Sequence, residues 1–224
     1  MKSLRVIFFS GIFLCLAGIL TSCSDDGYSL GDMWVGIATV DNLDDENFTL
    51  TIGDSTTLWI GASSVPHYHP KEKRALINFT ILGDNYAGYD HIVKLNSIRE
   101  VLTKNVETID RDSLEKVTND PIKLKSIWIS GGYLNIRYSY PYGGDSQHEV
   151  NLFKVEELGV VLPGDTIKLE FCHNTKDDTN RWWIETYVSF DLKSLQRAGK
   201  DIVELEVMMN TTDGEKISNI TYKY

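Results

Sequence analysis

The residues best suited by type and spacing to bind a metal ion are His67 and His69, which are separated by one residue. On a strand they would project from the same face. A third imidazole would have to come from elsewhere in the chain, from His91, His148 or His173. Zinc needs three or four ligands that converge, and the prolines on both sides of the pair indicate a loop. We therefore predict no metal site and no cofactor.

Carboxylates are the next candidates, as cation ligands or as acid–base pairs. They cluster at Asp41, Asp44, Asp45 and Glu46, and again at Asp177 and Asp178. Neither cluster has the order of a calcium loop, and aspartate is an ordinary turn former, so we predict solvated turns. The sequence also has no G-x-S-x-G, H-E-x-x-H or G-x-x-x-x-G-K-[ST] motif. We predict that the protein is not an enzyme and has no catalytic residues.

The thiol of Cys23 is the group with a definite expected chemistry. It follows a short basic start and an almost wholly apolar run at residues 6–20, which is too short to span a membrane and is typical of a signal peptide. The sequence LTSC at residues 20–23 resembles a lipobox, in which the cysteine receives a diacylglycerol and the chain is cut before it. We predict a signal peptide over 1–22 and a lipid anchor on Cys23; plain secretion is the alternative.

The segment after the anchor bears on location. The sequence SDD at residues 24–26 resembles the acidic tag of surface-exposed lipoproteins of some Gram-negative bacteria, although an ordinary solvated tether would look the same. We predict a tether over 23–32 that holds the protein at the outer membrane of a Gram-negative bacterium. The expected side is the cell surface, and a periplasmic orientation is the alternative.

Cys172 is the one cysteine left after Cys15 is removed with the signal and Cys23 is acylated. No intramolecular disulfide is then available. Its neighbours follow a strand pattern, so we expect a buried thiol. Because adjacent strand residues point to opposite faces, Cys172 and His173 are not expected to form a nucleophile and base.

Four aromatic residues are candidate ligand contacts. Trp182 and Trp183 must face opposite sides of a strand, so one can fill the sandwich core. The other then lies on the outer face, unless an edge or the barrel covers it. Tyr140 and Tyr142 flank a hairpin loop. Exposed aromatic rings stack on sugars and anchor protein interfaces. The alternative is that these rings only pack two domains together.

The charge balance excludes one class of partner. The whole chain has a formal net charge of −10, and removing Lys2 and Arg5 with the signal changes it to −12. A surface this acidic repels phosphate backbones, so we expect no nucleic-acid partner. The sequence does not indicate an oligomeric state.

Two sets of strands position these residues. Five candidates precede residue 103, with alternating apolar residues and turn chemistry between them, at 33–40, 48–52, 56–62, 74–82 and 89–102. This pattern suits a small OB-type barrel, for which we assign residues 33–108. Residues 109–122 are charged, have lost the alternation and are assigned as a linker.

The second set has turns every 8–12 residues, which is typical of a β-sandwich. Its candidate strands lie at 123–130, 133–140, 148–155, 166–173, 182–191, 202–209 and 217–224. The fold prediction is therefore all-β, with a small N-terminal barrel followed by a sandwich over 123–224.

The mature sequence resembles the NigD-like lipoproteins. The resemblance rests on Cys23 in its lipobox, the strand pair RALINFTIL and HIVKLNSIREVLTK, the hairpin YLNIRYSYPYGG, and the run EFCHNTKDD followed by WIETYVSFDLKSL. It implies an OB-type domain followed by a β-sandwich. The family was named from its association with a bacteriocin gene region, and the resemblance provides no functional residues to transfer.

These observations lead to an expected role. We expect a lipid-anchored protein of the cell envelope that binds or scaffolds a protein or a glycan without catalysis. The alternative, which the resemblance alone suggests, is an accessory protein in bacteriocin production or immunity.

Overall fold

The structure is a computed structural model that describes residues 28–42, 47–156, 166–179 and 181–224. The predicted signal peptide, Cys23, and the acidic residues at 44–46 lie outside these ranges. None of the helices in the described ranges is long and apolar enough to cross a membrane.

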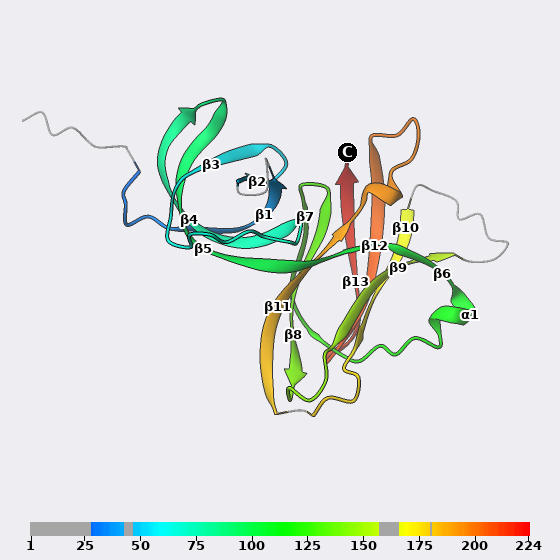
Figure 1. Ribbon diagram of the computed structural model, residues 1–224. Helices are drawn as coiled ribbons and strands as arrows, with labels where there is room; N and C mark the ends of the chain where they lie inside the picture. The colour runs from blue at the N-terminus through cyan, green and yellow to red at the C-terminus, as the bar shows by residue number, and fades with distance from the viewer. Residues whose placement is uncertain (1–27, 43–46, 157–165, 180) are drawn as a thin grey trace, which may run out of the picture.

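Five strands form an N-terminal barrel (Figure 1). They are β1 (Trp34–Asn42), β2 (Phe48–Ile52), β3 (Thr56–Ser63), β4 (Arg74–Tyr86) and β5 (Tyr89–Asn105). Each strand pairs with two others, so the ring closes in the order β1-β2-β3-β5-β4, with β3 and β5 parallel. Alternate residues such as Leu50, Ile77 and Val93 are fully buried inside it. The predicted OB-type barrel is confirmed.

The remaining strands form two facing sheets. They are β6 (Glu107–Asp110), β7 (Lys123–Ser130), β8 (Tyr133–Tyr142), β9 (Glu149–Glu156), β10 (Thr166–Asn174), β11 (Trp182–Asp191), β12 (Ile202–Thr211) and β13 (Gly214–Lys223). The end of β5, with β11, β8 and β7, makes one sheet, and β13-β12-β10-β9-β6 makes the other. Leu134, Phe171 and Val207 belong to the core that both sheets enclose. The all-β prediction, with a C-terminal sandwich, is confirmed.

The segment 109–122, which the sequence analysis assigned as a linker, packs on the sandwich. Its first residues complete β6, which pairs in parallel with β9. The short helix α1 (Arg111–Leu114) follows, and the Asp110 side chain caps it by accepting a hydrogen bond from the Ser113 N–H. Leu114 is buried, and Ile122 belongs to the sandwich core. The pattern did not predict these apolar contacts, because charged residues interrupt the alternation in this segment.

One strand belongs to both domains. β5 is 17 residues long; its first part closes the barrel, and its last residues pair in parallel with β11, from Leu102 against Val188 to Asn105 against Asp191. In Figure 1 it runs continuously out of the barrel and into the sandwich. The two domains are therefore joined by a continuous hydrogen-bonded ladder.

A buried arginine forms the second connection. Arg74 of β4 has no exposed surface, and its guanidinium donates to Ser130 Oγ at 3.0 Å and to Asn135 Oδ1 at 3.3 Å in the sandwich. It also lies over the Tyr133 ring, 4.8 Å from the centroid. Burial lowers the pKa of Arg74 to about 10, which the Tyr133 hydroxyl partly opposes, so the guanidinium stays charged at neutral pH. The turn at Gly131 (φ +60°) must lack a side chain, because a Cβ there would lie 2.9 Å from Arg74 Nη1.

Candidate functional site

Three of the four predicted aromatic residues lie together at one end of the sandwich. Tyr140 and Tyr142 are on β8, and Trp182 of β11 pairs directly with Tyr142. The ring centroids are 6.3 Å apart between Tyr140 and Tyr142 and again 6.3 Å apart between Tyr142 and Trp182. Same-face residues on neighbouring antiparallel strands meet in this way. We call these three residues the aromatic end.

Trp183 is separate from this group. It lies opposite Pro141 and faces the other side of β11, where the Lys123 ammonium sits 3.7 Å from its ring centroid. Neither tryptophan takes up the core position that was open to one of them: Trp182 is 52% exposed and Trp183 46%. Both precede the part of β11 that the opposite sheet covers, and burial begins only at Val188.

The aromatic end does not pack the two domains together. On β8 the contacts of Arg74 are with Tyr133 and Asn135, at the start of the strand, whereas Tyr142 is its last residue. In Figure 1 this end of β8 and β11 points away from the barrel. The inter-domain contact is made instead by Arg74 and the turn at Gly131, whose N–H donates to Asp54 Oδ1 at 2.9 Å. The rings are therefore free to contact something else.

A cleft of about 500 Å³ opens beside the rings. Its lining combines aromatic side chains with hydroxyl, amide and imidazole groups; it includes Tyr140, Tyr142, Gln147, His148, Thr186 and Tyr187. Aromatic faces with a few polar groups among them are the usual lining of a small-ligand site.

A buried carboxylate holds the loop that lines one side of this cleft. Asp178, in the β10–β11 connection, accepts hydrogen bonds from the backbone N–H groups of Gly143 and Gly144 through Oδ2, at 2.7 and 3.1 Å, and of Asp145 through Oδ1, at 2.7 Å. Its side chain has no exposed surface. A Cβ on Gly143 would overlap with Thr179, so this residue must be glycine for the two loops to meet.

The prediction that Asp178 lies in a solvated turn is therefore wrong. Burial by itself would raise the pKa of Asp178, but the hydrogen bonds from Gly143, Asp145 and His148 outweigh it and hold this pKa well below its usual range. The carboxylate is thus ionised at neutral pH. The sequence did not indicate that Asp178 is buried, because the groups that donate to it belong to the β8–β9 loop, more than 30 residues earlier.

Two histidines extend the chain of hydrogen bonds inward. His148 Nε2 lies 3.0 Å from Asp178 Oδ2, and His148 Nδ1 lies 2.9 Å from His173 Nε2. An ionised carboxylate can only accept, so it fixes the proton of neutral His148 on Nε2, and His173 then donates to Nδ1. The Tyr140 ring packs against both imidazoles, with centroids 4.5 and 5.1 Å away. The carboxylate therefore orients the histidine next to the aromatic rings.

The inner histidine is kept neutral. Burial and the neighbouring His148 lower the pKa of His173 to about 4, against a smaller opposing effect of the Asp120 backbone. In the described part of the chain, neither histidine hydrogen-bonds a serine, threonine or cysteine side chain. Their hydrogen bonds run to Asp178 and to each other, so the arrangement positions the β8–β9 loop.

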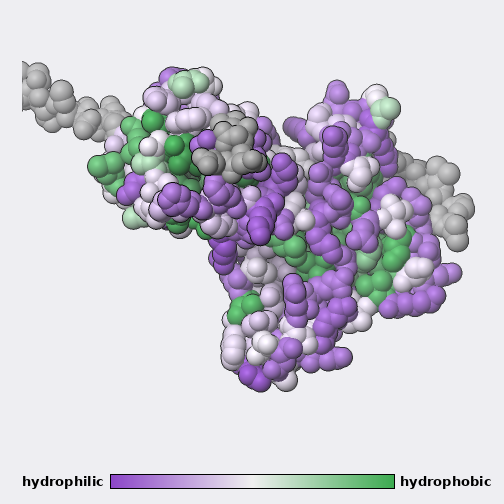
Figure 2. Space-filling view, in the orientation of Figure 1, coloured by the Kyte–Doolittle hydropathy of each residue, from purple (hydrophilic) through white to green (hydrophobic). Residues whose placement is uncertain are grey.

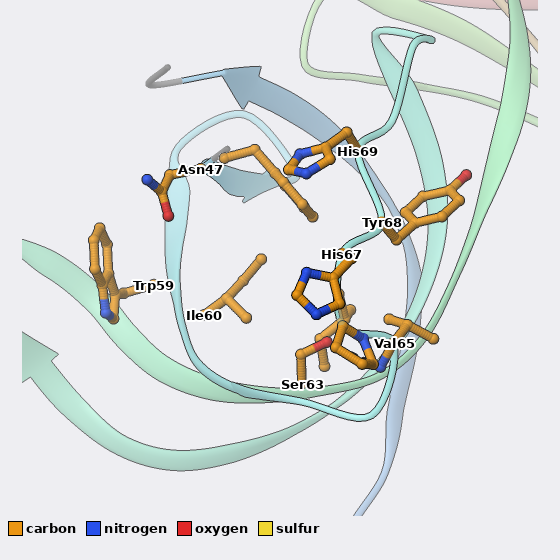
Figure 3. A pocket seen from close by; sticks show the side chains of 11 residues that line it. Asn47, Trp59, Ile60, Ser63, Val65, His67, Tyr68 and His69 are labelled. Atoms are coloured by element: carbon orange, nitrogen blue, oxygen red, sulfur yellow. Dashed lines mark hydrogen bonds between the residues drawn. The ribbon is translucent and has the colours of Figure 1, made fainter. Parts of the chain in front are cut away.

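A second depression, of about 420 Å³, lies on the barrel and is drawn in Figure 3. Trp59 and Ile60 of β3 form one wall, and His67 and His69 of the β3–β4 connection form the other. The two histidines lie in a loop, and His67 has the left-handed φ of +60°. Among the described residues, no group of three histidine, cysteine, aspartate or glutamate side chains is arranged to hold a metal ion.

Cys172 is buried, as predicted, at 2% exposure. It packs with Leu114 and Phe153 under α1, whereas His173 faces the aromatic rings on the other side of β10. The prediction that the two neighbours point apart is confirmed. Burial raises the pKa of the thiol to about 12, so Cys172 is not a reactive thiolate at neutral pH.

The sequence matches two domain families in succession. Residues 37–101 match the NigD-like N-terminal OB domain, and residues 105–224 match the NigD-like C-terminal β-sandwich domain. The chain belongs to the NigD-like family. The boundary between the two matches falls within the last residues of β5, the strand that the NigD-like barrel and sandwich share.

Several solved structures have the same fold. A "Putative TOXIN related protein" from Parabacteroides distasonis is 32% identical, with a TM-score of 0.72 over 86% of this chain and 94% of that one. A "NigD-like immunity protein" from Bacteroides caccae is 18% identical (TM-score 0.63, 88% and 99% covered). A "Putative lipoprotein" from Bacteroides fragilis is 12% identical (TM-score 0.61, 86% and 99% covered). The search of curated proteins gave no match.

Proposed function

We propose that this NigD-like chain is a lipid-anchored, non-enzymatic binding module of the cell envelope, and that its ligand contacts the aromatic end. The anchor would be Cys23, at the outer membrane of a Gram-negative bacterium and facing the cell surface. One observation carries the proposal. Tyr140, Tyr142 and the 52%-exposed Trp182 line up beside a cleft at the end of the sandwich that is remote from the barrel.

The chemistry of the cleft favours a glycan over a purely apolar ligand. Aromatic faces stack on the C–H faces of sugars, and the hydroxyl and amide groups of Tyr187, Thr186 and Gln147 provide hydrogen bonds to sugar hydroxyls. Arg181 and Asp145 hold each other at the rim, at 3.3 Å, and add polar contacts there. A protein segment with an aromatic or polar side chain is the other class of ligand that these groups fit.

The Asp178–His148 pair serves the site by positioning it. Because Asp178 fixes three backbone N–H groups of the β8–β9 loop, the Tyr142 ring at the start of that loop is preorganised. Preorganised aromatic side chains lose little conformational entropy on binding. This role needs no proton transfer, in keeping with a binding module.

Adjacent tryptophans on opposite faces of β11 offer a matched test. The mature protein is titrated onto immobilised envelope polysaccharide, and saturable retention is measured. Trp182→Ala should weaken binding about tenfold or more, as expected of an aromatic hot spot. Trp183→Ala, on the next residue and similarly exposed, should bind like wild type. Equal affinity of wild type and Trp182→Ala, or equal losses in the two variants, would contradict the proposal.

A role in toxin biology is the second candidate. It is favoured by the names of two relatives, the toxin-related protein of Parabacteroides distasonis and the immunity protein of Bacteroides caccae. Deleting the gene should then change the sensitivity of the cells to a bacteriocin, and restoring the wild-type chain should reverse the change. If the deletion strain is as sensitive as wild type to all toxins of a bacteriocin-producing strain, the role in toxin biology is contradicted and glycan binding is favoured.

A further inference from the structure

Exposed hydrophobic side chains are concentrated where the described chain begins. Of the twelve exposed large hydrophobic residues in the described ranges, five fall within residues 28–35. They are Tyr28, Leu30, Met33, Trp34 and Val35, with exposures of 43 to 78%. Figure 2 shows hydrophobic residues gathered on this part of the barrel. We call residues 28–35 the apolar segment. Single hydrophobic residues scattered over a surface need no explanation, but a group of them in one segment indicates a binding surface.

The local structure displays these side chains instead of covering them. Leu30 lies at the tip of a turn that is closed by the Asp32 N–H donating to Ser29 O at 2.9 Å, a position that usually carries a polar residue. Trp34 and Val35 are consecutive and face opposite sides of β1, yet both are exposed. This end of β1 pairs with β4, but its pairing with β2 begins only at Ala38, so Trp34 and Val35 extend beyond β2.

The position of the apolar segment in the chain limits what can cover it. Tyr28 is five residues after Cys23, and a chain extends at most about 3.5 Å per residue, so Tyr28 lies within roughly 18 Å of the acylated residue. The Tyr28 ring packs on His91 of β5, with centroids 6.1 Å apart, and His91 bonds Asp84 of β4. The barrel itself therefore begins at this short distance from the predicted anchor.

The composition of the apolar segment fits the boundary of a lipid bilayer. Tryptophan and tyrosine favour the membrane–water interface, and leucine, methionine and valine favour the hydrocarbon beneath it. The segment carries one charged side chain, Asp32, in a protein with a net charge of −10. Membrane attachment strengthens with the apolar area that is buried next to an acyl anchor.

We infer that the apolar segment docks into the interfacial layer of the bilayer that holds the Cys23 anchor, so that the barrel rests on the membrane. This inference rests on the proposed lipid anchor. It adds a defined contact surface to the anchor and fixes which end of the molecule faces the membrane.

Fluorescence quenching by brominated lipid tests the contact. The lipidated mature protein is reconstituted into phosphatidylethanolamine–phosphatidylglycerol vesicles in which part of the lipid carries bromine on its acyl chains. Bromine quenches only nearby tryptophans. Trp34→Phe should lose more than half of the quenching seen in wild type, whereas Trp182→Phe should keep it. The two residues are matched controls, because their exposures are 51 and 52%. Equal melting temperatures verify that both variants are folded.

The outcomes separate the docking from the anchor. Protein that floats with the vesicles but is quenched equally in wild type and Trp34→Phe overturns the docking and leaves the anchor standing. If that protein also sediments as a dimer, the apolar segment contacts a second copy of the chain and not the membrane. Protein that does not float with the vesicles overturns both the anchor and the docking.

Discussion

At the scale of single residues, Asp178 determines the shape of the aromatic end. One carboxylate accepts hydrogen bonds from three backbone N–H groups of the β8–β9 loop and from one imidazole, so the protein's own groups hold the loop in one conformation. Buried charges are stable only when they are hydrogen-bonded in this way. The second imidazole, His173, is buried at 1% exposure, and its Nδ1 has no hydrogen-bond partner among the described residues. It is therefore the part of this network that is most sensitive to protonation.

The low pKa of His173 predicts a loss of stability in mild acid. The group stays neutral in the folded protein down to about pH 4, whereas in the unfolded chain it takes up a proton below about 6.5. Stability is thus complete above pH 6.5 and falls as the pH drops toward 4, by up to about 3 kcal/mol. Chemical denaturation between pH 4.5 and 7.5 measures this slope.

A matched pair of variants assigns the slope to the buried ring. His173→Gln keeps a donor for His148 but does not titrate, so its stability should depend less on pH than that of wild type. His69→Gln, in the exposed β3–β4 connection, should retain the wild-type slope. The assignment fails if His173→Gln follows the wild-type curve.

At the scale of elements, α1 acts as a cover for one thiol. Leu114 packs on Phe153 and Cys172 on the outer face of the second sheet. Leu114→Ala should leave a cavity that costs about 2–4 kcal/mol and opens a path to the sulfur. Alkylation of the Cys172 peptide, followed by mass spectrometry, should become faster than in wild type. Leu102→Ala removes an exposed leucine from β5 and should not change the rate; a similar acceleration there would mean that global unfolding exposes Cys172.

The elements also indicate how far sequence reasoning reaches. Alternation located the strands because each sheet has one face on a core, as with Leu134, Ile136 and Tyr138 of β8. It also brought Tyr140, Tyr142 and Trp182 forward as candidates. It did not predict that β5 continues into the sandwich, or that Asp178 is buried. Both features depend on partners that are distant in the sequence: β5 pairs with β11 at Val188, and Asp178 accepts from Gly143. A local sequence pattern cannot predict such partners.

At the scale of the whole molecule, Arg74 and β5 predict that barrel and sandwich unfold together. Calorimetry of wild type should show one cooperative transition. Arg74→Ala should cost on the order of 3 kcal/mol, because it leaves a cavity and removes donors from Ser130 and Asn135. The transition should then broaden or split as the domains lose their coupling. Arg99→Ala, an exposed arginine of the same barrel, should retain a single transition. Two transitions in wild type would show that the domains are independent.

The strand β5, which both domains share, has a consequence for how the protein folds while it is being made. Every strand of the barrel precedes residue 106, so a chain made from its N-terminus can close the barrel early. Residues 102–105 of β5 gain their partner only later, when β11 is made and Val188 pairs with Leu102. In the interval the ladder has an open edge, and open edges recruit other chains. Aggregation should therefore be greatest while residues 106–187 are being made, which is when a holding chaperone would protect this protein most.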